Sequence, residues 1–105
     1  MENSYKDLIR TKLEMKNEVE LENYKFRLLI YADVALTYLK NYRKFYKKIQ
    51  TETVINQIKV LIKVLNVDKL LLDSSTQLDF MVDLECALIW LSLNEKIEIL
   101  ILGES

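Results

Sequence analysis

The sequence predicts an all-α fold, a small bundle of four or five helices with one long central helix, and it predicts self-association. The chain holds one glycine and no proline in 105 residues, and β-turns and hairpins depend on these two residue types. Half of the residues are hydrophobic and 30% are charged, which is typical of a globular chain. A chain of this length forms one domain, so residues 1–105 are expected to be a single helical domain.

The first predicted helix runs from about Ser4 to Leu21. Its apolar points include Leu8, Ile9 and Leu13, and the segment is otherwise strongly charged. The sequence leaves open whether this helix continues into the next one without a break.

The second predicted helix, Glu22 to Gln50, is the long central one. Aromatic and aliphatic residues alternate along it at spacings of four and three, which is the heptad seam of packed helices. A seam of this length needs a helical partner, and its tyrosine hydroxyls would each need a hydrogen bond in a buried interface. The predicted seam consists of Tyr24, Leu28, Tyr31, Ala35, Tyr38, Tyr42, Phe45 and Ile49.

A third helix is predicted from Glu52 to Asn66, with Thr51 or Thr53 as its N-cap. Its many β-branched residues leave a strand as the alternative. A fourth helix is predicted from Thr76 to Leu91, capped by a serine at position 74 or 75.

A short last helix is predicted from Asn94 to Leu102. Ser92 and Glu95 fit the capping box S-x-x-E, and Gly103 suits the C-terminal cap. The tail IEILIL is also good strand material, so helix and strand both stay open for residues 94–102.

The sequence holds few residues suited to catalysis, and it predicts a protein that is not an enzyme and needs no cofactor. There is no histidine, which removes the commonest general base and metal ligand. Asp79 and Asp83 lie one helical turn apart, with Glu85 near them. Two carboxylates at this spacing could share a divalent cation or a proton, but an acidic solvated face is the expected interpretation. The single cysteine, Cys86, lies in an apolar stretch and is expected to be a buried, inert thiol.

The stretch YLKNYRKFYKKI, residues 38–49, holds five basic and four aromatic residues. On a helix the cations share one side and the aromatics the other, whereas base-stacking surfaces place both on one exposed face. We call these cations the basic arc, and they are expected to meet nucleic acid, an acidic protein or only water. The basic arc consists of Lys40, Arg43, Lys44, Lys47 and Lys48.

Charge and apolar runs also bear on location. Residues 25–63 carry nine basic and two acidic side chains, and residues 64–105 carry two basic and eight acidic ones, so a basic and an acidic face are expected. No stretch has the roughly 20 apolar residues of a membrane span, and the first ten residues lack a signal-peptide core. A single cysteine cannot form a disulfide within the chain, which fits a reducing compartment. Together these features predict a cytoplasmic protein without membrane contact.

The stretch FMVDLECALIWLSLNEKIEILILGES, residues 80–105, resembles the start of sigma-70-type region 4 and of ArpU-type phage late-transcription regulators. In those families a DNA-reading helix-turn-helix follows this stretch, whereas the sequence here ends at Ser105, so no DNA-reading residue carries over. The resemblance implies a protein-contacting helical scaffold. The matching positions are Asp83, Leu84, Glu85, Ala87, Leu88, Leu91, Ser92, Glu95, Ile99 and Ile101.

These observations predict a small non-enzymatic regulatory protein that acts by helix-mediated protein–protein contact, with a phage or mobile-element regulator or inhibitor as one form. Its expected partners are another protein and a second copy in a homo-oligomer such as a dimer. The first alternative is a nucleic-acid-binding transcriptional regulator that uses the basic arc. The second is a purely structural helical oligomer.

Overall fold

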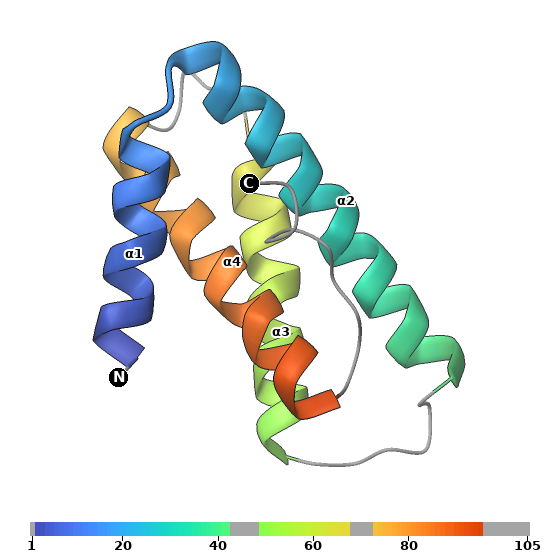
Figure 1. The fold of residues 1–105 in the computed structure, drawn as a ribbon. Coiled ribbons are helices and arrows are strands. Elements are labelled where there is room, and N and C mark those ends of the chain that lie inside the picture. The colour runs from blue at the N-terminus through green and yellow to red at the C-terminus, as the bar shows by residue number, and fades with distance from the viewer. Residues whose placement is uncertain (1, 43–48, 68–72, 96–105) are drawn as a thin grey trace.

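The computed structural model describes residues 2–42, 49–67 and 73–95, and this part of the chain forms four α-helices and no strand. The all-α prediction is therefore confirmed, and residues 49–65 are helix and not strand. Figure 1 shows the helices in chain order: α1 (Glu2–Glu14), α2 (Glu18–Tyr42), α3 (Ile49–Leu65) and α4 (Ser74–Glu95).

A capping box separates α1 from α2, so the first two helices are not continuous. The backbone N–H of Glu20 donates to Asn17 Oδ1 at 2.9 Å, and the N–H of Asn17 donates to Glu20 Oε1, also at 2.9 Å. Each side chain thereby satisfies a backbone group that the start of a helix leaves unpaired. The chain turns sharply at this point and α2 runs back past α1 (Figure 1).

The observed start of α3 differs from the predicted one. The helix begins at Ile49, so Thr51 and Thr53 lie inside its first turns and neither is the N-cap. The Thr53 hydroxyl donates back to the carbonyl of Ile49 at 3.0 Å, a bond that threonine makes within helices.

The cap of α4 is Asp73 and not one of the serines that follow it. The backbone N–H of Thr76 donates to Asp73 Oδ1 at 2.7 Å, and this bond lowers the pKa of the Asp73 carboxyl. At its other end α4 continues through Ser92 to Glu95. Ser92 therefore opens no new helix, and the rest of the predicted last helix, with Gly103, lies outside the described residues.

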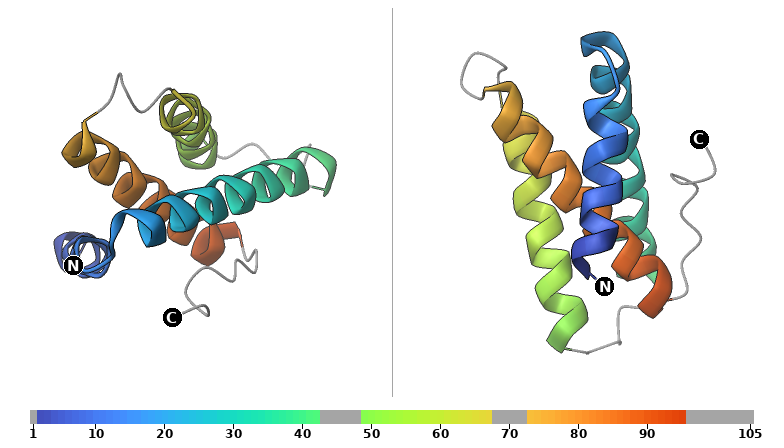
Figure 2. Two further views of the ribbon diagram at one scale, coloured as in Figure 1. Left: turned by 90° about the horizontal axis from the view of Figure 1, so that it is seen from above. Right: turned by 60° about the vertical axis from the view of Figure 1, so that its left-hand side comes forward.

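The helix at the centre of the packing is α4. Although α2 is the longest described helix, with 25 residues, α4 packs against all three other helices. Figure 2 shows α1 and α2 crossing it, with α3 alongside. Buried side chains therefore occur around most of its circumference, and they include Met81, Leu84, Leu88 and Leu91.

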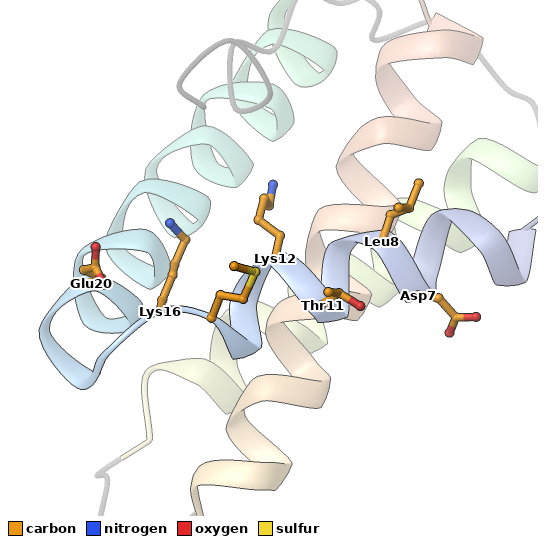
Figure 3. A pocket seen from close by; sticks show the side chains of 7 residues that line it. Asp7, Leu8, Thr11, Lys12, Lys16 and Glu20 are labelled. Carbon is orange, nitrogen blue, oxygen red and sulfur yellow. The ribbon is translucent and has the colours of Figure 1, made fainter.

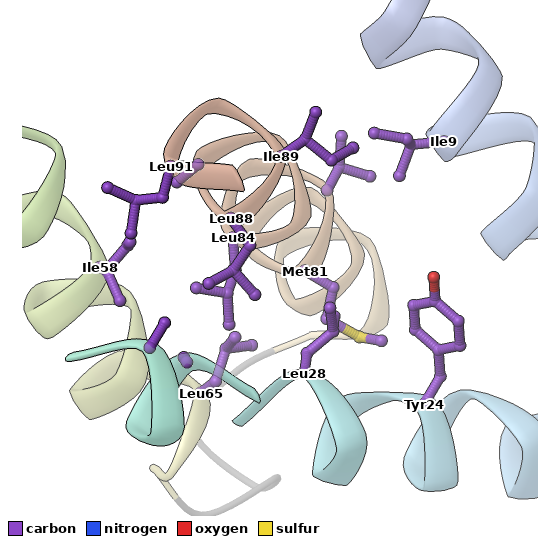
Figure 4. Close-up of a cluster of buried hydrophobic side chains, with 14 of the residues drawn as sticks. Ile9, Tyr24, Leu28, Ile58, Leu65, Met81, Leu84, Leu88, Ile89 and Leu91 are labelled. Atoms are coloured by element: carbon purple, nitrogen blue, oxygen red, sulfur yellow. The ribbon is translucent and has the colours of Figure 1, made fainter. Parts of the chain in front are cut away.

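The hydrophobic core gathers around α4 (Figure 4). Leu28 of α2 and Ile58 and Leu65 of α3 are almost completely buried there, as are Ile9 and Leu13 of α1. None of the described helices is long and apolar enough to cross a membrane.

Candidate interaction surfaces

The predicted seam of α2 is largely covered within the chain. Tyr24, Leu28 and Ala35 belong to the chain's own core, and the half-buried Tyr31 and Tyr38 pack against it. The helices α3 and α4, which both pack against α2, thus supply the helical partner that the seam requires. The described part of the seam consequently does not itself call for a second copy.

The last three seam positions lie at or after the final residue of α2 in the sequence. Tyr42 is its final residue, and Phe45 lies outside the described residues. Ile49 begins α3 instead, and its side chain is 84% exposed, because the heptad spacing passes through a helix boundary.

One member of the basic arc is described. Lys40 lies exposed in the last turn of α2, where a cation interacts favourably with the helix dipole. Arg43, Lys44, Lys47 and Lys48 lie outside the described residues, and contact of the arc with nucleic acid stays a prediction.

The acidic pair on α4 meets cations of α1. Asp83 forms an ion pair with Lys6 at 3.2 Å, and Asp79 forms one with Arg10. The two carboxylates are therefore neutralised by side chains of this chain. Cys86, which was expected to be buried, is half-buried. No cluster of three acidic or cysteine side chains suited to a metal ion occurs among the described residues.

A buried polar cluster joins α1, α2 and α4. Glu85 is completely buried in the middle of α4. The Tyr24 hydroxyl donates to its Oε1 at 2.5 Å, and Lys12 Nζ donates to its Oε2 at 3.0 Å. Lys12 Nζ also donates to the Tyr24 hydroxyl oxygen at 2.7 Å. A carboxylate without water is stable only when it is paired and hydrogen-bonded in this way.

Cations also surround the Tyr24 ring. The Nζ atoms of Lys12 and Lys16 lie 5.0 and 5.2 Å from the ring centroid, and the Arg27 guanidinium carbon lies 5.6 Å from it. These distances are within the range of cation–π attraction. The nearby charge of Arg27 lowers the pKa of the Tyr24 hydroxyl. Burial has a larger effect and raises this pKa well above its usual value, and the hydrogen bond to Glu85 raises it further.

The raised pKa of Tyr24 predicts a loss of stability at alkaline pH. In the unfolded chain Tyr24 ionises near pH 10, whereas in the folded chain it stays protonated. The unfolded chain therefore binds fewer protons above pH 10, and the free energy of unfolding falls there by up to about 1.4 kcal/mol per pH unit. Below pH 10 this contribution is fully present.

The measurement is urea unfolding of the wild type and of Tyr24→Phe between about pH 8 and pH 11. The other tyrosines and the lysines titrate in both proteins, so the difference between the two isolates Tyr24. We expect the difference in the free energy of unfolding to be constant up to about pH 10. Above that pH the wild type should lose stability relative to Tyr24→Phe. Parallel curves over the whole range would contradict the assignment.

A second buried carboxylate joins α3 to α4. The Thr51 hydroxyl donates to Glu95 Oε2 at 2.7 Å, and both side chains are buried. The other oxygen of Glu95 has no hydrogen-bond partner within the described part of the chain. Thr51, a predicted N-cap, and Glu95, the glutamate of the predicted capping box, therefore make a contact between helices.

An exposed apolar row runs along the outer face of α2. Phe26, Ile30 and Val34 follow one another at one-turn spacing, and their side chains are 53%, 60% and 59% exposed. We call these three residues the outer row. The sequence did not predict this row, because the heptad seam accounted for the apolar content of α2. A count of apolar residues at i, i+4 and i+8 on the opposite side would have found it.

A shallow hollow lies on the outer side of α1 and the turn that follows it (Figure 3). Leu8 and Met15 are exposed there, and two lysines and two carboxylates also line this surface. The balanced charges favour neither an anionic nor a cationic ligand. The lining residues are Asp7, Leu8, Thr11, Lys12, Met15, Lys16 and Glu20.

Comparison with protein-family models, with curated proteins and with solved structures finds no match for this chain. The resemblance to sigma-70-type region 4 and to ArpU-type regulators therefore stays a hypothesis. What the chain does has to be argued from its own surfaces.

Proposed function

We propose that this chain is a non-enzymatic protein that acts by helix-mediated contact with another protein chain, and that the outer row of α2 is its contact surface. The observation that carries the proposal is the row itself, in which Phe26, Ile30 and Val34 are each more than half exposed. Single exposed apolar residues are normal on protein surfaces, whereas contiguous ones mark interaction sites.

The outer row has the dimensions of a helix contact. Three residues at one-turn spacing extend over about 12 Å of helix, and this is the anchor pattern with which amphipathic helices enter grooves or pair. The exposed polar residues Asn23, Asp33 and Thr37 flank it. An apolar centre with a polar rim is the usual anatomy of a protein interface.

A second copy of the chain suits this row. A two-fold interface brings the same patch of both copies together. In an antiparallel pair of α2 helices centred on Ile30, the two isoleucines face each other. Phe26 of each copy then lies near Val34 of the other, so a large and a smaller side chain alternate along the contact. The row is therefore self-complementary in size as well as in polarity.

Sedimentation velocity tests self-association through the row with two matched variants. Val34→Asp places a charge in the row, while Val60→Asp places one on α3 at a side chain that is equally exposed, 59% in both cases. We expect wild type and Val60→Asp to associate as concentration rises, and Val34→Asp to associate at least about tenfold more weakly, because burial of an unpaired carboxylate is costly.

Circular dichroism of both variants provides the folding control, since each changes an exposed residue and should leave helix content unaltered. Equal association of the two variants would contradict the assignment of the outer row as the interface between copies.

A further inference from the structure

The helix α1 is attached to the rest of the chain in an unusual way. It packs extensively against α4 among the described helices, and it reaches α2 through the contact of Lys12 with Tyr24. Figure 2 shows it crossing α4 on the outside of the bundle. Two apolar side chains of α1, Ile9 and Leu13, are buried, and Figure 4 shows Ile9 beside Ile89 of α4.

The other apolar side chains of α1 contribute little to its attachment. Tyr5 is 44% exposed and Leu8 is 69% exposed, so half of the apolar side chains described in this helix face solvent. The link to α2 is short and ends at Asn17, which is itself exposed.

Charge supplies the rest of the attachment. Three cations of α1 each pair with a different carboxylate of α4. Lys6 and Arg10 lie one turn apart on one side of the buried stripe of α1, and Lys12 lies on the other side of it. In two of the pairs both side chains are partly exposed. In the third pair, that of Lys12 with Glu85, the carboxylate is completely buried. The pairs are Lys6 with Asp83, Arg10 with Asp79, and Lys12 with Glu85.

We propose that α1 is a releasable strap, and that its departure opens an acidic face on α4 that accepts a basic amphipathic helix from a partner protein. This face is distinct from the outer row of α2, so the proposal does not rest on the function proposed above. The order of the charges along α4 determines which helix fits. An incoming helix must present cations four residues apart to meet Asp79 and Asp83.

Glu85 makes the face selective. When α1 lifts away, this carboxylate regains water and is no longer a buried charge. A purely apolar helix that docked there would bury Glu85 again without a cation, which is strongly unfavourable. A helix with a lysine or arginine at the place of Lys12 restores the pair. The face therefore rejects apolar helices and accepts basic ones.

Hydrogen–deuterium exchange of the whole chain tests the release. We expect amides of α1 to exchange at least about tenfold faster than those of α4, and to exchange faster still in 0.5 M NaCl, where exposed charges are screened. The double variant Asp79→Asn, Asp83→Asn should accelerate amide exchange in α1 in the same way and leave amide exchange in α3 unchanged. Asp33→Asn, which removes an exposed carboxylate of α2, is the control and should have no effect. Exchange of α1 at the rate of α4 in every condition would overturn the proposal.

A peptide added in trans tests the partner. The probe is a labelled peptide with the sequence of residues 2–16, followed by fluorescence anisotropy against whole chains. We expect it to bind Lys6→Gln, Arg10→Gln, whose own strap is weakened, at least about tenfold more tightly than the wild type. The chain with Asp79→Asn and Asp83→Asn should not bind it, although its strap is also weakened. If the peptide bound neither of the two double variants, or bound both of them equally tightly, the assignment of the acidic face would be overturned.

Discussion

Replacement of Leu88 by alanine should lower the free energy of unfolding by about 2–5 kcal/mol. Leu88 is completely buried in α4, the helix against which α1, α2 and α3 all pack. The substitution removes apolar contacts and leaves a cavity that closely packed neighbours cannot close. Urea unfolding followed by circular dichroism measures the effect, which should appear as a lower midpoint with an unchanged slope.

Leu93 provides the control for this prediction in the same helix. Its side chain is 69% exposed, so Leu93→Ala makes the same chemical change without a cavity and should alter stability by less than about 0.5 kcal/mol. If both variants lost the same stability, α4 would not be the helix around which the core is built.

Replacement of Lys12 by methionine should destabilise the chain by about 2–3 kcal/mol. Removal of one partner from a buried ion pair typically costs about 3–5 kcal/mol, because the other charge stays buried without compensation. Lys12 itself is 30% exposed, so water can partly replace it and the effect is expected to be smaller. Lys16→Met is the matched control. The Nζ of Lys16 lies 5.2 Å from the centroid of the Tyr24 ring, close to the 5.0 Å of Lys12, whereas among the described residues Glu85 accepts its hydrogen bonds from Lys12 and Tyr24.

The same cluster predicts an asymmetry between breaking and replacing it. The triple variant Lys12→Met, Tyr24→Phe, Glu85→Leu removes the charge together with its partners and fills the space with apolar groups. It should be at least as stable as Lys12→Met alone, and about as stable as the wild type. A triple variant that is less stable than Lys12→Met would show that the cluster contributes net stability.

The sequence predicted where the helices lie far better than it predicted the burial and the hydrogen-bond partners of their polar residues. Periodicity placed the apolar stripe of α4, and the lack of glycine and proline made an all-α fold the simplest outcome. The need of Tyr24 for a hydrogen-bond partner followed from its place in the seam. That the partner is Glu85 did not follow, because the sequence grouped Glu85 with the acidic side chains of a solvated face.

The physical reason is that burial depends on neighbouring helices. One helix considered alone has an apolar and a polar side, but α4 is covered from three directions, and Glu85 falls under one of the covering helices. Thr51 and Glu95 show the same effect. Each fits a local capping rule, yet their side chains bond to each other across two helices. A local motif competes with tertiary contacts that a single sequence does not reveal.

The helix boundaries were missed for a different reason. Asn17 and Glu20 form a capping box in a highly charged stretch, where no change of hydrophobic pattern marks the turn. Asp73 caps α4 although two serines follow it directly, because a charged carboxylate at this position also interacts favourably with the helix dipole.

The most direct test of the central proposal is site-specific photo-crosslinking in the source cell. A diazirine amino acid is placed at Val34 in the outer row or at Val60 on α3, two positions with equal exposure. We expect a covalent adduct of higher mass from position 34, with a second copy or with another protein, and no adduct from position 60. Adducts of equal yield at both positions, or none at position 34, would contradict the proposal that α2 makes the contact.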